Sequence, residues 1–240
     1  AGRVSARGGK GYTVKDGFEG NGGTIELTAR GNVGLFNVLE LNANGGNSSG
    51  AGAGDGGIVS FTAASGAVRL DSFAIQARGG AATFYQSAQA GEGGQVLTSS
   101  STVQMGDVEV DASGGSSVQP SGAPTDSPLE GGVGGSGGII ELVAAGSMQL
   151  GDPAPLLAVH LLATGGATYS RGSDGGSGGE IRLLTTGLTF AGTALVTGGA
   201  SQTGLPGDDG SICADGASDD VLITLRGASG VDVGPCTAGP

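Results

Sequence analysis

Few side chains in this sequence are of the types that catalyse reactions, and one pair of them is placed to do so. Glu141 lies between Ile140 and Leu142, and Arg182 occupies the same position in a similar segment. Alternation of this kind exposes the polar side chain, so neighbouring segments could bring the carboxylate beside the guanidinium. A carbohydrate-cleaving enzyme needs a cluster of such groups on one face. One pair is not a cluster, so we interpret it as a surface ion pair and expect no enzymatic activity.

An acidic stretch near the end of the chain contains the candidate metal ligands. Asp208, Asp209 and Asp215 could supply oxygen ligands to Ca²⁺, the one cofactor that the sequence suggests. The strict Gly-Gly-x-Gly-x-Asp repeat of calcium-binding β-rolls is absent from the sequence, so solvated loop charge is the competing interpretation. The single histidine, His160, lies between Val159 and Leu161 and is expected to face outward as an ordinary surface side chain.

The two cysteines, Cys213 and Cys236, are close enough in sequence to close a loop of about two dozen residues. A disulfide is the favoured interpretation and two inert thiols are the alternative, because two cysteines without histidine partners are too few for a structural zinc site. A disulfide predicts a secreted protein.

Composition excludes several classes of protein. The chain has 240 residues with 54 glycines but only 8 prolines, which does not fit collagen. The net charge is −12 and the ten basic residues are scattered, so we expect no nucleic-acid partner. The chain lacks an apolar run of the roughly 20 residues that a membrane helix needs, so we expect no membrane insertion. Apolar residues make up 37% and are grouped periodically, which argues against disorder.

A repeat organises the sequence. Each unit begins with a strand-like pair whose leading residues are 34, 37, 44, 41 and 42 positions apart. The pairs are Ile25 and Leu27, Val59 and Phe61, Val96 and Thr98, Ile140 and Leu142, Ile181 and Leu183, and Ile223 and Leu225. A Gly-Gly pair precedes the first five, and two further short strand-like segments follow each pair. A connection of variable length, rich in glycine, then leads to the next unit.

This pattern predicts an all-β, single-stranded, right-handed parallel β-helix, or β-solenoid. We expect about five to six coils of three short strands each, with long Gly-rich loops on one side. Glycine pairs would supply either positive φ or close backbone approach. Residues 1–240 form a single domain: 1–21 as a partial N-terminal coil and loop, 22–219 as five coils with loops, and 220–240 as a partial C-terminal coil.

The two partial coils complement each other. The residues after Gly2 match a third strand, whereas the chain ends after a second strand. Stacking one subunit on the next would complete a coil and cover the exposed sheet edges, and a contact that does not close into a ring builds a filament. The residues expected to form this contact are Val4, Ala6, Gly8, Gly9, Ile223, Leu225, Val231 and Val233. Trimming from a longer solenoid is the alternative explanation of the two ends.

The coil openings GG-x-[IV]-x-[LF] and endings [LIV]-x-A-x-GG resemble the Gly-rich parallel β-helix repeats of secreted bacterial surface proteins, including haemagglutinin-like and autotransporter-type adhesins. Thr98 and Val196 depart from the pattern. The resemblance implies an extracellular fibre, adhesin or scaffold and carries no catalytic motif. We therefore expect a secreted structural subunit that forms a head-to-tail homopolymer at the cell surface. The alternative is an adhesin or glycan-binding stalk that contacts glycans or other cell-surface components.

Overall fold

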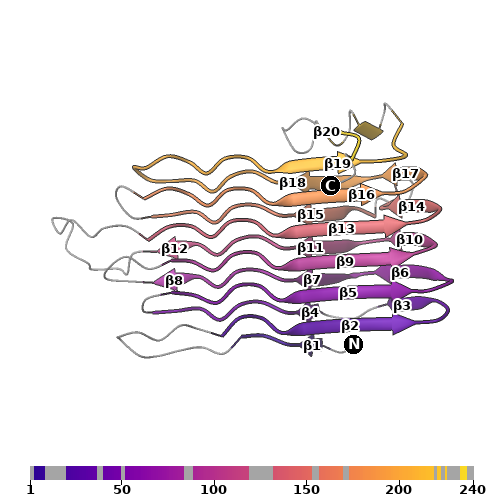
Figure 1. Ribbon diagram of the computed structural model, residues 1–240, viewed down its shortest axis with the longest axis horizontal. Helices are drawn as coiled ribbons and strands as arrows, with labels where there is room; N and C mark the ends of the chain where they lie inside the picture. Colours follow the sequence, from indigo (N-terminus) through magenta and orange to yellow (C-terminus); the bar gives the residue numbers. More distant parts are fainter. Residues whose placement is uncertain are drawn as a thin grey trace.

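The alternating apolar segments form β-strands that pair in parallel with the equivalent strands of the next repeat. The computed structural model describes residues 3–8, 20–36, 40–49, 52–83, 89–118, 132–152, 157–169, 173–218, 221–222, 225 and 233–236. All the paired strands in this part of the chain are parallel, so the protein is all-β with parallel sheets. The chain passes through the same three sheets in the same order five times, and we call one such passage a coil (Figure 1).

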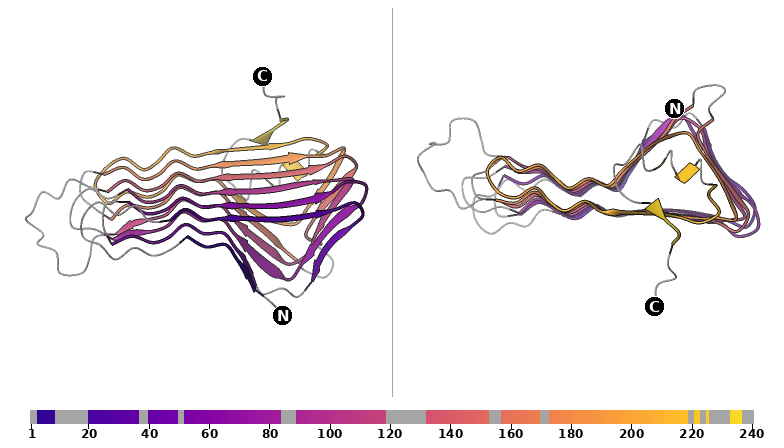
Figure 2. Two further views of the ribbon diagram at one scale, coloured as in Figure 1. Left: turned by 60° about the horizontal axis from the view of Figure 1, so that its bottom comes forward. Right: turned by 90° about the horizontal axis from the view of Figure 1, so that it is seen from above.

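Three sheets surround the core (Figure 2). Sheet I contains β2 (Thr24–Ala29), β5 (Ile58–Ala63), β9 (Gln95–Ser100), β13 (Ile139–Ala144), β16 (Glu180–Leu184), β19 (Ser211–Ala214) and β20 (Val233–Gly234). Sheet II contains β3 (Val33–Phe36), β6 (Ala67–Asp71), β10 (Thr102–Met105), β14 (Ser147–Leu150) and β17 (Gly187–Phe190). Sheet III contains β1 (Arg3–Ser5), β4 (Glu40–Asn42), β7 (Phe73–Gln76), β11 (Val108–Asp111), β15 (Val159–Leu162) and β18 (Gly192–Leu195).

Seen along the stack, the three sheets enclose a triangular core (Figure 2, right). The register aligns like side chains on successive coils: Ile25 lies beside Val59, which lies beside Val96. In β5, for example, Val59, Phe61 and Ala63 are buried and the residues between them are more exposed, so each sheet contributes one apolar face. Phe61 and Leu142 are fully buried, and most of the other inward side chains are buried as well. The predicted strands of the first five coils are therefore confirmed.

A flat, double-layered extension projects from one corner of the triangle (Figure 2). Its outgoing limbs are 43–49, 77–83, 112–118, 163–169 and 196–202, and its returning limbs are 20–23, 52–57, 89–94, 132–138, 173–179 and 205–210. We call this two-layered structure the glycine wall. Short strands β8 (Ala82–Thr83) and β12 (Ser117–Val118) pair within its outgoing layer.

A column of eleven glycines joins the two layers of the wall. Each donates its backbone N–H to the carbonyl of the preceding one, alternating between layers, over ten hydrogen bonds of 2.7–3.0 Å. The column is Gly20, Gly46, Gly54, Gly80, Gly91, Gly115, Gly135, Gly166, Gly176, Gly199 and Gly207. None of these eleven residues has a positive φ. A Cβ on Gly115 would lie 1.9 Å from the Gly80 carbonyl oxygen. Gly80 is the equivalent glycine of the preceding coil in the same layer, so close backbone approach between coils, not positive φ, is why glycine is needed here.

The prediction for the last coil is wrong. Its first strand is β19, in which Ile212 pairs with Ile181, and not the segment at Ile223 and Leu225. Val221, Leu222 and Leu225 are helical, and Leu225 is fully buried against the core. The alternation was misleading because the described residues of this segment, Val221, Leu222 and Leu225, are helical and pack against the end of the core.

Val233 also departs from the prediction. It belongs to β20, which pairs with β19 in sheet I, and not to a second strand of sheet II. The C-terminal end of the described structure is therefore closed by a helical segment and one added strand.

Candidate functional site

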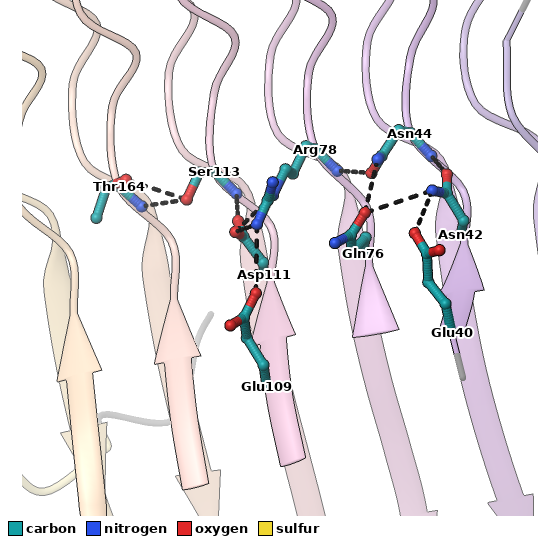
Figure 3. A network of polar contacts seen from close by, with 9 residues as sticks. All are labelled: Glu40, Asn42, Asn44, Gln76, Arg78, Glu109, Asp111, Ser113 and Thr164. Carbon is teal, nitrogen blue, oxygen red and sulfur yellow. Dashed lines mark hydrogen bonds and ion pairs between the residues drawn. The ribbon is translucent and has the colours of Figure 1, made fainter. Parts of the chain in front are cut away.

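Polar side chains gather where sheet III meets the glycine wall. Strands β4, β7 and β11 end there and continue into the outgoing limbs, and the surface is concave at this junction (Figures 2 and 3). We call the group the polar corner; its members are Glu40, Asn42, Asn44, Gln76, Arg78, Glu109, Asp111, Ser113 and Thr164. The β register places Asn42, Gln76 and Asp111 side by side on successive coils. Asn42 and Asp111 are buried at this concave junction, whereas Gln76 is partly exposed.

Amide side chains form the N-terminal half of the polar corner. Asn42, 4% exposed, donates from Nδ2 to Glu40 Oε1 at 2.5 Å and to Gln76 Oε1 at 3.3 Å. Asn44 also donates to Gln76 Oε1, at 3.0 Å, and its backbone N–H donates to Asn42 Oδ1 at 3.1 Å. On the next coil, the backbone N–H of Arg78 donates to Asn44 Oδ1 at 2.8 Å. The amides therefore connect two coils and satisfy each other's polar atoms.

A charged group forms the other half. Arg78 donates from Nε to Asp111 Oδ2 at 2.5 Å and pairs with Glu109 at 3.3 Å. The Arg78 side chain is 41% exposed, whereas that of Asp111 is only 5% exposed. Asp111 Oδ1 also accepts from the Ser113 backbone N–H at 2.9 Å, and Thr164 donates to Ser113 Oγ at 3.0 Å. The buried carboxylate thus has both a charged partner and a backbone donor, as burial of a charge requires.

The hydrogen bonds of the polar corner hold sheet III and the glycine wall at a fixed angle, so we call it a joint. Its donors and acceptors point at one another across coils, as Figure 3 shows, and they join the last residues of the strands to the first residues of the limbs. A hydrogen-bonded network of this kind resists rotation of one element against the other. We interpret it as the joint that sets the angle between sheet III and the glycine wall, with Arg78 and Glu109 half-exposed at its surface.

Replacing Arg78 with methionine tests this interpretation. The variant keeps the length of the side chain but leaves the Asp111 carboxylate without its guanidinium, so we expect the free energy of unfolding to fall by about 2 kcal/mol. Urea titration followed by circular dichroism measures the change. The double variant R78M/D111N should recover at least half of the loss, because a neutral amide can still accept from Ser113. The charge-matched control is R30M, at an exposed position. Equal losses of unfolding free energy in R78M and R30M would contradict the interpretation of the polar corner as a joint.

The pair predicted from the sequence is present on sheet I. Glu141 and Arg182 are aligned on β13 and β16, with 3.4 Å between Oε2 and Nη1. Glu180, on the same strand as Arg182, makes the closer contact at 2.7 Å. Hydrogen bonding to Glu180 is the main cause that raises the pKa of Arg182 above its ordinary value. The three side chains are all partly exposed, so they form a surface ion-pair network that contributes little to stability.

The predicted disulfide is confirmed: Cys213 in β19 is bonded to Cys236, 23 positions later. Asp215 lies beside it and accepts from the Cys236 backbone N–H at 2.9 Å. The bond therefore fastens the segment after β20 to the outer face of sheet I.

The candidate calcium ligands accept hydrogen bonds from different parts of the backbone. Asp209 Oδ1 accepts from the Gly198 N–H at 2.9 Å, and Asp215 accepts from Cys236. Within the described ranges, no three His, Cys, Asp or Glu side chains are grouped in a way that could hold a metal ion. Asp208 accepts from the Gly178 N–H at 2.8 Å through its backbone carbonyl, and Ca²⁺ binding stays a prediction.

The residues predicted to form the subunit contact are only partly described. The strand that contains Val4 pairs with β4, and Ala6 and Gly8 continue it into the glycine wall. Leu225 is buried in the core and is not on an open edge, whereas Val233 lies in β20, the terminal strand of sheet I. Gly9, Ile223 and Val231 lie outside the described residues.

Sequence reasoning missed the polar corner. Asn42, Gln76 and Asp111 each precede an Ala-x-Gly-Gly ending by one position, so a column of polar residues was visible in the repeat alignment. Its burial was not visible, because outward residues of a strand are ordinarily exposed. His160 was placed correctly: it faces outward, with Nδ1 2.7 Å from Thr193 Oγ1 on the next coil.

Comparison of the chain with family models, with curated proteins and with solved structures gives no match. In the part of the chain that the structure describes, no helix has the length and apolar character needed to cross a membrane. Any functional assignment must therefore be argued from the sheets, the glycine wall and the polar corner.

Proposed function

We propose that the chain is a rigid, non-catalytic stalk module of an extracellular surface protein, built as a right-handed parallel β-solenoid. The observation that carries this proposal is the glycine column, a series of ten hydrogen bonds that runs through every coil from Gly20 to Gly207. Together with the three sheets, it gives each coil axial bonds on all sides of the stack. Such an arrangement transmits load along the stack and leaves the outer faces available for side chains that contact partners.

The disulfide supports the extracellular part of the proposal, because such bonds persist in oxidising compartments. The acidic composition supports it as well, since a net charge of −12 keeps an elongated, sheet-rich protein soluble. Exposed sheet edges are otherwise prone to association.

Pulling a single molecule by its two ends with an atomic force microscope tests the stalk. If coils carry the load one at a time, each rupture should release roughly 120–150 Å of chain, the extended length of one coil. Reducing Cys213–Cys236 provides an internal control, since it should add roughly 70–80 Å to the total released length. Extension without discrete ruptures would overturn the proposal, because a module without axial resistance cannot act as a stalk.

Head-to-tail assembly into a filament is the second candidate function. It is favoured by the N-terminal end, where β1, β2 and β3 each form the edge of a sheet. The burial of Leu225 weighs against it at the other end, because no open half-coil is formed by that residue. Negative-stain microscopy separates the two candidates. Filaments formed by the full chain, but not by a chain that lacks residues 1–9, would favour assembly over a stalk that acts as a single module.

A further inference from the structure

A hollow of about 300 Å³ lies on the outer face of sheet II, away from the polar corner. Phe36, Arg69, Asp71, Gln104, Gln149 and Leu157 contribute to its lining. Four coils supply these residues, from β3 to the segment after β14. The hollow is at the lower end of the size range of small-molecule sites, which suits a single sugar ring and not a longer oligosaccharide.

Glycines create the hollow. The column that begins with Phe36 and Asp71 continues on the next two coils as Gly106 and Gly151, which have no side chain to fill the space. Gly151 has a φ of 76°, and a Cβ there would lie 2.1 Å from the Ala191 carbonyl oxygen. A Cβ on Gly106 would lie 2.2 Å from Asp71 Oδ1. Gly151 therefore requires glycine, and a side chain at Gly106 would displace the Asp71 carboxylate, so glycine at both positions keeps the floor of the hollow open.

An aromatic ring borders the hollow. Phe36 is 57% exposed, an unusual exposure for phenylalanine. A Cβ on Gly34 would lie 3.0 Å from Phe36 Cε2, so the ring lies over Gly34 on the outer face of the sheet. An exposed aromatic face of this kind attracts the C–H groups on the apolar side of a pyranose ring.

Planar polar groups line the hollow beside the ring. Gly34, Arg69, Gln104 and Gln149 are aligned on successive strands, so a guanidinium and two amides follow the ring at the spacing of the strands. All three side chains are exposed. Guanidinium and amide groups can donate two hydrogen bonds, or donate and accept, in one plane, which matches adjacent hydroxyls on a sugar.

Asp71 is held in place at the edge of the hollow. Its Oδ1 accepts from Ser72 Oγ at 3.2 Å and from the Asp107 backbone N–H at 3.3 Å. Ser72 has a φ of 62°, a left-handed conformation that is uncommon for a residue other than glycine. Such strain is typical of positions that hold a functional group in a fixed orientation.

We propose that this hollow binds one neutral pyranose unit of an extracellular glycan. The sugar's apolar face stacks on Phe36, and its hydroxyls bond to Arg69, Asp71 and Gln104. Two carboxylates, Asp71 and Asp152, line the hollow against the single guanidinium of Arg69, so a neutral sugar fits better than an anionic one. The site goes beyond the stalk role and would remain if the module carried no load.

Saturation-transfer difference NMR tests the proposal with the methyl glycosides of glucose, galactose, mannose and N-acetylglucosamine, each measured separately. At least one should receive saturation from the protein at its ring protons. The variant F36A should weaken binding on the order of tenfold, whereas F36Y should retain it. The matched control is Y169A, which removes another exposed aromatic ring, from the glycine wall, and should leave binding unchanged.

Circular dichroism of F36A separates loss of binding from loss of folding, and Q104A, at an exposed position, provides a second probe of the same site. Two results would overturn the proposal. One is that none of the four glycosides gives a signal above that of folded F36A. The other is that methyl glucuronide binds through the hollow and the neutral glycosides do not, which would assign the site to an anionic ligand.

Discussion

Replacing Gly115 with alanine should lower the melting temperature by about 10 °C, the largest effect that we expect from a single methyl group in this protein. The added Cβ would lie 1.9 Å from the Gly80 carbonyl oxygen and 2.6 Å from the Gly80 carbonyl carbon. The neighbouring atoms belong to the backbone of the other coil, so they cannot rotate away as a side chain would. The two coils must therefore separate locally to accommodate it.

Separation weakens bonds on both sides of Gly115. Its N–H donates to the Gly91 carbonyl at 2.8 Å, and its carbonyl accepts from Gly135 at 3.0 Å. Loss of two buried hydrogen bonds together with overpacking costs about 4 kcal/mol. Alanine also restricts the unfolded chain, which stabilises the protein by about 0.4–1 kcal/mol. The steric cost therefore exceeds the entropic gain several-fold.

Gly187→Ala is the matched control for this prediction. Gly187 begins β17, and a Cβ at that position would meet nothing within 4 Å. The same substitution should there leave the melting temperature unchanged or raise it slightly. Differential scanning calorimetry of both variants checks the comparison. Melting temperatures within about 2 °C of each other would show that successive coils of the glycine wall are not as close as the structure indicates.

Removing the disulfide should destabilise the C-terminal end more than the rest of the stack. The variant C213S/C236S opens a loop of 23 positions, and closing a loop of this length stabilises a folded state by about 3 kcal/mol. In the described part of this segment, β20 pairs with β19 at two register positions, and Val233 is buried against the core. We therefore expect the loss to be concentrated at β19 and β20.

Hydrogen exchange followed by mass spectrometry measures this loss. Amides of β19 should exchange on the order of 100-fold faster in C213S/C236S, as a 3 kcal/mol loss implies. Amides of β5 and β9, in the middle of the stack, serve as the internal reference and should exchange at unchanged rates. Uniform acceleration throughout the chain would contradict a local role and would mean that the coils unfold as one unit.

The repeat made most of the fold predictable. Each of the first five coils begins at a Gly-Gly pair followed by alternating apolar residues, and the register of sheet I follows from aligning those pairs. Parallel stacking requires that each strand resemble its neighbours, so the signal was repeated five times. Glycine pairs indicated close approach or positive φ, and only the structure separates these two causes.

The errors lie where the repeat ends. Asp209 and Gly210 replace the Gly-Gly pair before β19, and Cys213 replaces an outward residue. The sequence of β19 therefore does not match the repeat pattern. The alternation of Ile223 and Leu225 was stronger and was preferred. A helical segment that closes an end can display the same short alternation, because three or four residues are too few to separate the two periods.

The site was harder to predict than the fold. The pair of Glu141 and Arg182 followed from the register, but the polar corner depends on a concave junction between sheet III and the glycine wall. Strand patterns define which side of a sheet a residue faces, and they do not define the angle at which the chain leaves the sheet. Likewise, the hollow beside Phe36 exists because Gly106 and Gly151 fall in one column, which requires knowing the pairing of three coils.

The glycine column also has a consequence for the gene. Glycine is encoded by the four GGN codons, and every missense change of one base in such a codon introduces a residue that has a Cβ. At Gly91, Gly115 or Gly135, each of these changes would place that atom within about 2 Å of a backbone carbonyl oxygen. Every missense mutation of one base at these glycines is therefore expected to be destabilising. Diversity among descendants of this gene should accumulate at positions such as Asp55 and Glu92, exposed residues that adjoin the column's glycines.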